Sequence, residues 1–500
     1  MDKSKVIFGN VMPQGTYKKA CKGKAKNAKK YGYDENKSYP TVIQKNPYIG
    51  DSLNVDNILV GELDTNNHYN PEADTTTDFD MDKGIIVGNI RMGFGHYRIS
   101  MAMASCAKAM GYKPYWMDLN SYNETPCTKI IAASNELYSL GSRWSKNPIF
   151  NKLVWEPVNY ETFRQLSYNC ADQKNAEIMA QVYNNVPKDI PVIGTHAWPA
   201  QAAVGAGMKY VVNAIPDNWP MALHLSEGAI HTVQTPFAYL GYKKLNGMAK
   251  QPLKPMPEGS LFEVGHYVDH ELVSNIEHDC DLRIQRIEDG KPVRFLMTVG
   301  GAGAGADLYI AMTYHLLRYI KQKKASLIIN FGDHMDMWEM FNKKMRGFDR
   351  ICRTFFDDYE GLHEWADTLD GNMKSGVYAV YNKDIFEAVY STNLLMRKCD
   401  VLVTKPSELS FYPVPKLMMR HIGGHEVYGA VHAQEIGDST YECETKESLC
   451  NMIDTLINDK MILRSMCGKI KILKEQGIYD GGYKAVRLAA SGAGALSGNN

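Results

Sequence analysis

The sequence predicts an α/β fold with two consecutive domains, each built on a parallel β-sheet covered by helices. Two observations support this prediction. Short apolar strands alternate with helices along the chain, and a strand followed by a glycine-rich turn and a helix occurs twice, near residues 84 and 293. The length agrees, since 500 residues exceed the roughly 250–300 that one core usually organises.

The composition is that of an ordinary globular protein. It has 44% apolar and 22% charged residues, which excludes a disordered, collagen-like or coiled-coil chain. The 56 basic and 56 acidic residues cancel, so no overall field draws the chain to nucleic acid or anionic lipid. The ten cysteines form no CxxC pair, which argues against a structural zinc site. Without a signal peptide or a long apolar run, we expect a reduced, cytoplasmic protein, with peripheral membrane contact left open.

Residues 1–83 are polar, and we expect them to form an N-terminal extension and linker. Seven lysines lie between Thr16 and Lys30, a pattern typical of a solvated helix or of an arm that contacts the phosphates of lipid or nucleic acid. Asp78 and Asp80 form a DxD sequence like that which holds a metal-bound nucleotide in some sugar transferases. Its position in an acidic linker argues against a metal site here.

The first domain is predicted to span residues 84–280. It opens with a right-handed βαβ unit, in which an apolar strand, a turn, a helix of small and apolar residues and a second strand follow one another. Three more short apolar runs predict further buried strands. The predicted elements are strands at 84–90, 114–119, 190–194, 210–215 and 229–234 and a helix at 97–110.

The second domain is predicted to span residues 290–455. The charged stretch Glu277–Lys291 has no apolar run longer than two, so we expect the interdomain linker in it or just before it. Residues 456–490 are predicted to form C-terminal helices, with packing against the first domain left open, and 491–500 a flexible tail. The predicted elements are strands at 293–299, 326–331, 377–381 and 400–404 and a helix at 307–320.

Both glycine-rich turns suit the binding of an anion. Glycine lets backbone N–H groups approach closely, and a following helix adds a partial positive charge. The first turn contains Gly93 and Gly95, and the second runs from Gly300 to Gly305. Neither is a full dinucleotide fingerprint, because the second lacks an acidic residue about 20 positions on. A dehydrogenase is therefore disfavoured.

Several side chains that can take part in catalysis follow strands of the first domain. His96, at the start of the helix, can take a proton from an acceptor hydroxyl, or can cap the helix or contact a phosphate. His196 and Trp198 follow the strand at 190–194, and Asp217 and Trp219 follow the strand at 210–215. Asp217 can orient His96, act as the base itself or form a turn.

A second group of candidates belongs to the second domain. Thr404, Lys405 and Ser407 follow the strand at 400–404 and suit a diphosphate, since a lysine and hydroxyls lie beside a helix start. Glu408 can accept hydrogen bonds from sugar or ribose hydroxyls, and a carboxylate beside a histidine in the loop at 423–429 suits a polyol.

The order of these motifs over about residues 84–440 resembles the GT-B glycosyltransferases related to monogalactosyldiacylglycerol synthases and MurG-type transferases. The similar segments are MGFGHYRIS, PDNWP, GGAGAGA, Cys399–Ser407 and Gly423–Gly429. The resemblance implies two Rossmann-like domains facing a central cleft, with the acceptor in the N-terminal domain and a nucleotide sugar, a UDP-sugar, in the C-terminal domain. It also implies metal-independent transfer, usually with inversion, and no cofactor beyond the nucleotide sugar.

The resemblance assigns site residues by position. His96 and Asp217 are the expected catalytic residues. The expected acceptor contacts are Gly93, Gly95, His196, Trp198 and Trp219. The expected donor contacts are Gly300, Gly301, Gly303, Gly305, Asp333, His334, Thr404, Lys405, Ser407, Glu408, His425 and Glu426. The sequence departs from the pattern where Pro406 and Ser407 replace glycines and where His425 replaces a glutamine that normally touches the sugar.

The acceptor stays open between a lipid, a glycan and modified DNA. The aromatic-rich segment Ala132–Phe163 suits either membrane contact or packing on the first domain. Three other functions compete with a transferase of this kind: a glycosyltransferase acting on hydroxymethylpyrimidine in DNA, a nucleotide-sugar epimerase, and a non-catalytic nucleotide-sugar binding protein. Salt-sensitive DNA binding would favour the first, and donor turnover without an acceptor would favour the second.

Overall fold

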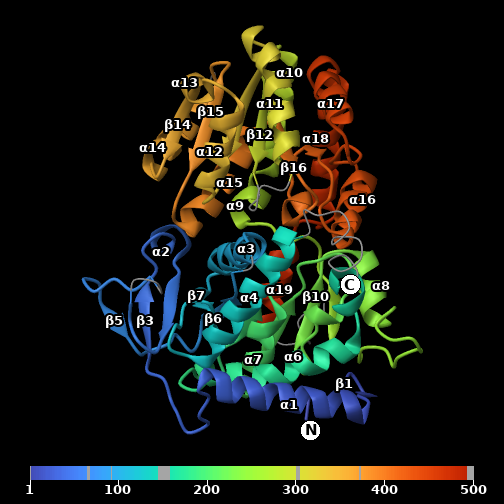
Figure 1. Ribbon diagram of the computed structural model, residues 1–500. Helices are drawn as coiled ribbons and strands as arrows, with labels where there is room; N and C mark the ends of the chain where they lie inside the picture. Colours follow the sequence, from blue (N-terminus) through green and yellow to red (C-terminus); the bar gives the residue numbers. More distant parts are fainter. Residues whose placement is uncertain are drawn as a thin grey trace. The chain divides into compact units, whose positions relative to one another are not determined.

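The computed structural model describes residues 2–64, 68–91, 93–144, 158–299, 305–370 and 373–491. The chain divides into two compact units. Unit 1 holds Met1–His270 together with the residues from Asp480 onward, and unit 2 holds Glu271–Tyr479. Each unit is an α/β structure with parallel strands at its centre (Figure 1). The prediction of two α/β domains with parallel sheets is therefore confirmed.

Unit 1 is built on one large sheet with helices on both faces, and a short β-hairpin near the N-terminus. The hairpin strands are β1 (Val6–Ile7) and β2 (Asn10–Val11). The sheet strands are β3 (Thr41–Lys45), β4 (Asp56–Val60), β5 (Thr75–Thr76), β6 (Gly84–Asn89), β7 (Lys113–Asp118), β8 (Val192–Gly194), β9 (Val211–Ala214), β10 (Ile230–Val233) and β11 (Leu261–Glu263). The helices are α1 (Gln14–Tyr31), α2 (Gly50–Leu53), α3 (Gly95–Ala109), α4 (Pro126–Trp144), α6 (Leu166–Met179), α7 (Ala197–Gly205), α8 (Pro236–Lys243) and α19 (Gly481–Ser491).

The strand order of this sheet, within the described residues, is β11-β10-β9-β8-β6-β7-β4-β3-β5. Neighbours from β11 to β4 run parallel, whereas β3 is antiparallel to both β4 and β5. β7 follows β6 along the chain and lies on one side of it, and β8 lies on the other. The strand order therefore reverses between β6 and β8, the kind of position where open α/β sheets bind ligands.

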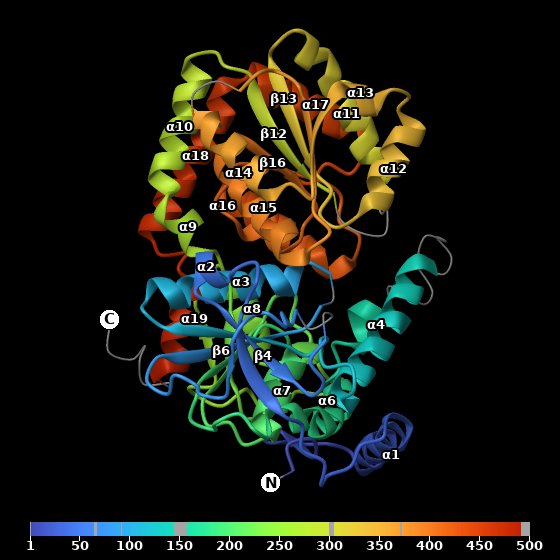
Figure 2. The same ribbon diagram turned by 90° about the vertical axis from the view of Figure 1, so that its left-hand side faces the viewer.

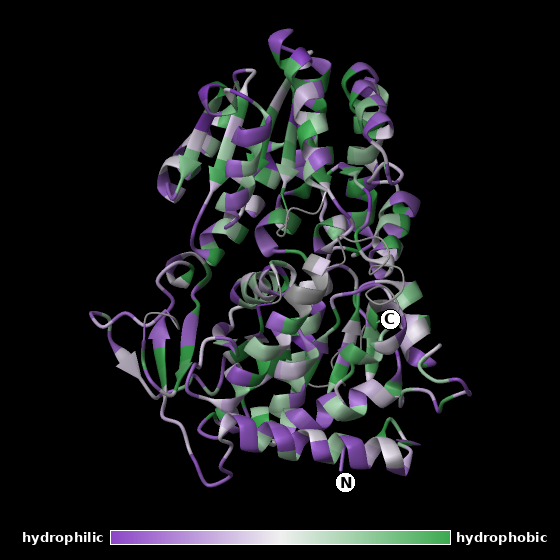
Figure 3. Ribbon diagram, in the orientation of Figure 1, coloured by the Kyte–Doolittle hydropathy of each residue, from purple (hydrophilic) through white to green (hydrophobic). Residues whose placement is uncertain are grey.

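The predicted βαβ unit is present as β6, α3 and β7, and the predicted strands at 190–194, 210–215 and 229–234 correspond to β8, β9 and β10. Every residue of β6 is buried. This is the burial expected of a central parallel strand that is covered on both faces. The apolar character of the central strands is visible in Figure 3.

The N-terminal 83 residues were predicted to be an extension, but most of them belong to unit 1. β4 extends the sheet beside β7, β3 pairs with β4, and α1 packs against α6. The sequence pattern hid these strands because β3 mixes polar and apolar residues, as an antiparallel strand near a sheet edge can. Asp80 of the DxD sequence accepts the backbone N–H groups of Asp82 and Lys83 at 3.1 and 2.9 Å, so it forms a turn before β6.

Unit 2 has a wholly parallel sheet within the described residues, in the order β14-β15-β13-β12-β16-β17. Its strands are β12 (Val293–Thr298), β13 (Ala325–Asn330), β14 (Cys352–Phe356), β15 (Val377–Tyr381), β16 (Val401–Thr404) and β17 (Lys416–Met418). Its helices are α10 (Ile276–Glu288), α11 (Ala306–Lys321), α12 (Met335–Lys344), α13 (Phe348–Ile351), α14 (Tyr359–Asp367), α15 (Ile385–Lys398), α16 (Val427–Ile436), α17 (Lys446–Asn458) and α18 (Lys460–Glu475), and α9 (His270–Ser274) lies at the boundary with unit 1. Here the strand order reverses between β12 and β16.

The charged stretch predicted to contain or follow the linker forms helix α10. The division between the units falls just before it, at Glu271. The buried positions Ile276, Cys280, Arg283 and Ile287 recur at helical spacing. The pattern was missed because one of them is charged: Arg283 is only 1% exposed, and its guanidinium donates to the carbonyl oxygens of two residues at the end of α15.

The C-terminal helices divide between the units. α17 and α18 belong to unit 2, whereas α19 belongs to unit 1 and packs against α3. Gly482 permits this approach, because a Cβ there would lie 2.7 Å from Sγ of Cys106 in α3. Within the described residues, the structure contains no helix with both the length and the apolar character needed to cross a bilayer.

Candidate functional site

The predicted catalytic residues of unit 1 lie at one edge of its sheet. His96 is in the first turn of α3 after β6, His196 immediately precedes α7 after β8, and Asp217 follows β9. The carboxyl ends of neighbouring parallel strands meet at the same edge, and here they bring the rings of His96 and His196 within 4.9 Å, edge to face. Two side chains 100 positions apart in the sequence thus share one site.

The hydrogen bond of His96 fixes which of its nitrogens can take a proton. Nδ1 lies 2.8 Å from the carbonyl oxygen of Thr195. A carbonyl oxygen can only accept, so Nδ1 carries the hydrogen and Nε2 is the basic nitrogen of the neutral ring. This is the tautomer that a general base acting through Nε2 requires.

His196 has the opposite tautomer and is kept neutral. Its Nδ1 accepts the backbone N–H of Trp198 at 3.1 Å and so caps α7, which leaves the hydrogen on Nε2. Burial lowers the pKa of His196 well below its usual value, and the neighbouring His96 and His224 lower that pKa further. At neutral pH His196 is therefore a hydrogen-bond donor rather than a cation.

Asp217 lies beside a histidine that sequence reasoning missed. Its Oδ2 is 2.9 Å from Nε2 of His224, which is buried at 4% side-chain exposure. The backbone of His224 is held in turn, because its carbonyl oxygen accepts from the side-chain amide of Asn213 at 2.6 Å. The only sequence signal for His224 was its position seven residues after Asp217 in the same loop.

The two tryptophans predicted to contact an acceptor are mostly buried, each 7% exposed. Trp219 stacks on Tyr160 at 4.9 Å, with the guanidinium of Arg164 4.4 Å from its ring. Trp198 lies 4.8 Å from the ring of His196 and hydrogen-bonds the carboxyl group of Asp172. Burial raises the pKa of Asp172 from 3.8 to about 7.

The turn before α3 has Gly93 in the left-handed region, at φ +85°, and Gly95 at the helix start.

The structure adds Asn89 to this site. It is the last residue of β6 and is 0% exposed, yet neither its amide nitrogen nor its amide oxygen has a hydrogen-bond partner among the described residues. Its neighbour across the strands is Asp118, which accepts the hydroxyl of Tyr97 in the first turn of α3. Paired residues of parallel strands point to the same face, so Asn89 also faces the start of α3.

In unit 2 the second glycine-rich turn follows β12 and leads into α11. Gly300, Gly301 and Gly303 lie outside the described residues. Gly305 is described and immediately precedes the helix with φ +77°, a conformation that favours glycine. Asp333 and His334 follow β13, the neighbour of β12, and the carboxylate of Asp333 lies 3.4 Å from Nδ1 of His334.

The predicted donor residues Lys405 and Glu426 form an ion pair, although 21 positions separate them. The other oxygen of Glu426 accepts the backbone N–H groups of Ile422 and Gly423 at 2.7 and 3.2 Å. Burial alone would lower the pKa of Lys405, but Glu426 and Glu408 raise it overall. Burial alone would raise the pKa of Glu426, but Lys405 lowers it overall. Both groups are therefore ionised at neutral pH.

The remaining predicted donor residues have local contacts. The hydroxyl of Thr404 donates to the carbonyl oxygen of Lys405 at 3.0 Å, and that of Ser407 accepts from the backbone N–H of Leu409 at 3.4 Å. His425 folds over the preceding loop, where a Cβ added to Gly423 would lie 2.6 Å from its ring. Of the predicted donor residues, the structure therefore brings three charged ones together, namely Lys405, Glu408 and Glu426.

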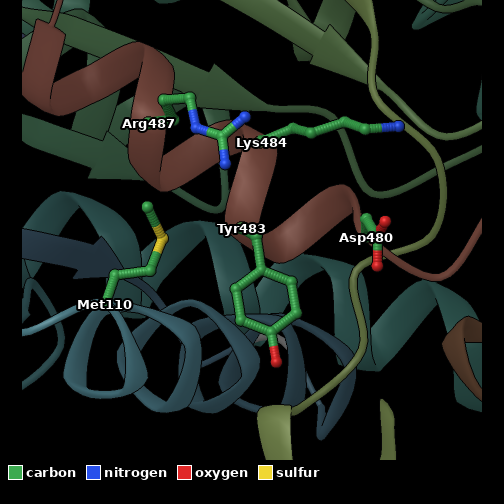
Figure 4. A pocket seen from close by; sticks show the side chains of 5 residues that line it. All are labelled: Met110, Asp480, Tyr483, Lys484 and Arg487. Atoms are coloured by element: carbon green, nitrogen blue, oxygen red, sulfur yellow. The ribbon is translucent and has the colours of Figure 1, made fainter. Parts of the chain in front are cut away.

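A separate cavity of 240 Å³ lies elsewhere in unit 1 and contains none of the predicted site residues (Figure 4). Its lining side chains are Met110, Asp480, Tyr483, Lys484 and Arg487. The hydroxyl of Tyr483 lies 2.6 Å from Nδ1 of His270. Among the described residues, no three His, Cys, Asp or Glu side chains are arranged to hold a metal ion together.

Comparison with known families gives two adjacent matches. Residues 6–244 match the family described as Domain of unknown function (DUF6937), and residues 256–490 match Domain of unknown function (DUF6938). Their boundary, between 244 and 256, lies close to the division between the units. No curated protein sequence matches the chain.

Three of the solved structures that resemble the chain match most of its length. One is the S. aureus MnaA–UDP co-structure, with TM-score 0.47, 11% identity, and 84% of this chain and 99% of that one covered. Another is UDP-GlcNAc 2-epimerase from Neisseria meningitidis bound to UDP-GlcNAc, with TM-score 0.40, 11% identity, and 81% and 98% covered. A third is α,α-trehalose 6-phosphate synthase from Burkholderia multivorans, with TM-score 0.41, 9% identity, and 82% and 100% covered.

Proposed function

We propose that this protein is a glycosyltransferase that moves a hexose or related sugar from a nucleoside-diphosphate donor, a UDP-sugar, to an acceptor hydroxyl, with inversion and without a metal cofactor. One observation supports this most strongly. In each unit, side chains able to take part in the reaction lie at the carboxyl edge of the sheet where the strand order reverses, His96 and His196 in unit 1 and Lys405 in unit 2. Open α/β sheets bind their ligands at such positions.

Unit 2 has the chemistry needed to hold the donor diphosphate. Lys405 follows β16, and α11 begins at Ala306 after the neighbouring β12. A lysine ammonium and a helix N-terminus both stabilise phosphate oxygens, and both can offset the negative charge that develops as the nucleoside diphosphate leaves. Glu408 and Glu426 can accept hydrogen bonds from sugar hydroxyls. In this proposal the lysine and the helix take the part that a metal plays in other transferases.

Unit 1 has the chemistry needed to activate the acceptor. Nε2 of His96 takes the proton of the acceptor hydroxyl, and the oxygen then bonds to the anomeric carbon. The bond between that carbon and the diphosphate oxygen breaks, and its electron pair leaves with the nucleoside diphosphate. The anomeric carbon passes through an oxocarbenium-like state, as in glycoside hydrolysis. His196 can donate a hydrogen bond from Nε2, and Asp217, which lies beside His224, acts electrostatically on His196.

Two measurements test the proposal. The first is calorimetric titration of the whole protein with UDP and a panel of UDP-sugars, in the presence of EDTA. The second is the release of UDP from each UDP-sugar that binds. It is measured without an acceptor and with lipid, glycan and hydroxymethylated-DNA acceptors. We expect binding that resists EDTA, and UDP release that depends on one class of acceptor.

Three other outcomes would contradict the proposal, each in a different way. Conversion of the donor sugar without any acceptor would indicate an epimerase. Binding without turnover on any acceptor would indicate a non-catalytic binding protein. The absence of nucleotide binding would overturn the assignment of Lys405 and its neighbours.

A further inference from the structure

We propose that α1 is the surface by which this protein lies on an anionic lipid bilayer. This inference concerns a surface that the proposed function does not use, and its test needs no sugar donor. It starts from the run of lysines near the N-terminus, which forms a helix of 18 residues. Such a helix is about 27 Å long. In Figure 3 it is largely hydrophilic.

The exposed lysines of α1 all lie on one side of the helix. At 100° per residue, they fall within an arc of about 120°, which contains only one other residue, Gly15. No arginine, aromatic residue or acid interrupts this arc. The exposed lysines are Lys18, Lys19, Lys22, Lys26, Lys29 and Lys30.

The opposite side of α1 is fixed to the body of unit 1, so the lysine arc is held outward. Ala20 is buried, and Ala28 and Tyr31 pack against the core of the unit. Lys24, the remaining lysine of the helix, lies on this inner side and pairs with Glu177 of α6 at 2.5 Å. The helix thus has one side packed on unit 1 and the other exposed to solvent. It lies at the periphery of the unit, near α6 (Figure 2).

The positive charge of the outer face is not neutralised by nearby acids in the sequence. From Lys3 to Tyr33 the chain contains no aspartate or glutamate. Within the described part of the chain, none of the exposed lysines of α1 pairs with a carboxylate. The whole protein has no formal net charge, so the positive charge of this face is local and does not reflect a basic surface overall.

The chemistry of the face favours lipid headgroups over nucleic acid. Proteins that bind nucleic acid combine lysines with arginine forks, amides that reach base edges, or aromatic rings that stack on bases. The arc on α1 has lysines alone, which act as point charges toward a surface of like anions. Clusters of lysines near a bilayer are attracted to anionic lipids, at about 1 kcal/mol for each lysine, or roughly fivefold in affinity.

The test is cosedimentation of the full-length protein with vesicles of phosphatidylglycerol and phosphatidylcholine, and with vesicles of phosphatidylcholine alone. We expect binding only to the anionic vesicles, with an affinity that falls as salt rises. The variant Lys22→Gln/Lys26→Gln removes two charges from the centre of the arc. We expect it to bind about 25-fold more weakly, at roughly fivefold for each lysine.

A matched control is Lys321→Gln/Lys324→Gln, which removes two exposed lysines from unit 2. It should bind as the unchanged protein does, and both variants should melt at the unchanged temperature, because all four side chains are exposed. Equal loss of binding in the two variants would mean a diffuse charge effect and would overturn the proposal. So would a lack of vesicle binding, or binding of labelled DNA or RNA that depends on Lys22 and Lys26 while the vesicles stay unbound.

Discussion

The carboxyl edges of the two sheets, which we propose as ligand sites, share one architecture but differ in the charge of their buried groups. At the edge of unit 1 burial disfavours charge, since it lowers the pKa of His196 well below its usual value and raises that of Asp172 to about 7. At the edge of unit 2, Lys405 and Glu426 keep their charges, because each holds the other in its ionised form. The carboxyl edges of two similar sheets therefore have different electrostatic properties, and each suits a different kind of chemistry.

The cause of the difference is the presence or absence of an opposite charge. Burial disfavours an ion, and only a close counter-ion or several hydrogen bonds to the ionised form can reverse that effect. Glu426 has both, a lysine and two backbone N–H groups. Among the residues that the structure describes, Asp172 has only the indole of Trp198 as a hydrogen-bond partner. A neutral edge suits proton transfer, and an ionic edge suits the binding of phosphate.

The largest expected effect tests the first half of this comparison. His96→Ala removes the proposed base and should slow sugar transfer by about 10²–10⁴-fold. The affinity for the nucleotide should not change, because the donor residues belong to unit 2. The measurements are turnover and calorimetry on the same preparation. His363→Ala, an exposed histidine of unit 2, is the control, and unchanged turnover in His96→Ala would show that another group is the base.

The next prediction tests whether the surroundings of the unit 1 site are held neutral. Asp172 has its pKa raised from 3.8 to about 7 in the folded state. Between these values the folded protein binds a proton that the unfolded chain has lost, so stability falls as pH rises through this window. Asp172→Asn removes the effect. It should stabilise the protein at pH 8, by at most ~4 kcal/mol, and change little near pH 4.

Urea unfolding of both proteins across this pH range measures the difference. In Asp172→Asn the indole of Trp198 can still donate a hydrogen bond, now to the oxygen of a neutral amide, so the fold should persist. Destabilisation of the variant by the same amount at every pH would show that Asp172 is ionised in the folded protein. The contrast between the two edges would then fail.

The third prediction tests the ionic edge. Lys405→Gln removes a charged hydrogen-bond donor and should weaken UDP binding by about 10–150-fold, the range that corresponds to 1.5–3 kcal/mol. It also leaves the carboxylate of Glu426 without its counter-ion, so the melting temperature should fall. The double variant Lys405→Gln/Glu426→Gln should recover stability but not affinity. Recovery of both would mean that Lys405 serves only the fold.

Much of the fold could be predicted because central parallel strands are continuous apolar runs. Gly84–Asn89 and Val377–Tyr381 are found where the sequence places them. β3 could not be predicted in this way, since it is short and mixes polar and apolar residues without a continuous apolar run or a clear alternation. The stretch over α10 looked like a linker because its buried face includes Arg283, whose guanidinium donates to carbonyl oxygens more than 100 positions along the chain.

The candidate site was predictable as motifs but not as contacts. His96 and His196, like Lys405 and Glu426, could be named from their positions after strands or in glycine-rich loops. That they touch depends on the strand order, which no local pattern encodes. His224 and Asn89 were missed for a related reason. A histidine in a loop and an asparagine at a strand end are common, and only their burial and surroundings distinguish them.

The prediction with the smallest effect concerns Asn89, at the carboxyl edge of the sheet in unit 1. The amide of Asn89 is buried without a hydrogen-bond partner among the described residues, an arrangement that costs stability unless a ligand satisfies it. Asn89→Ala should therefore leave stability unchanged or raise it by about 1 kcal/mol, while raising KM for the acceptor about five- to tenfold with kcat unchanged. Thermal unfolding and steady-state kinetics measure the two effects. A fall in stability with unchanged KM would show that the amide serves the fold, and the neutral edge would then bind its acceptor through the histidines alone.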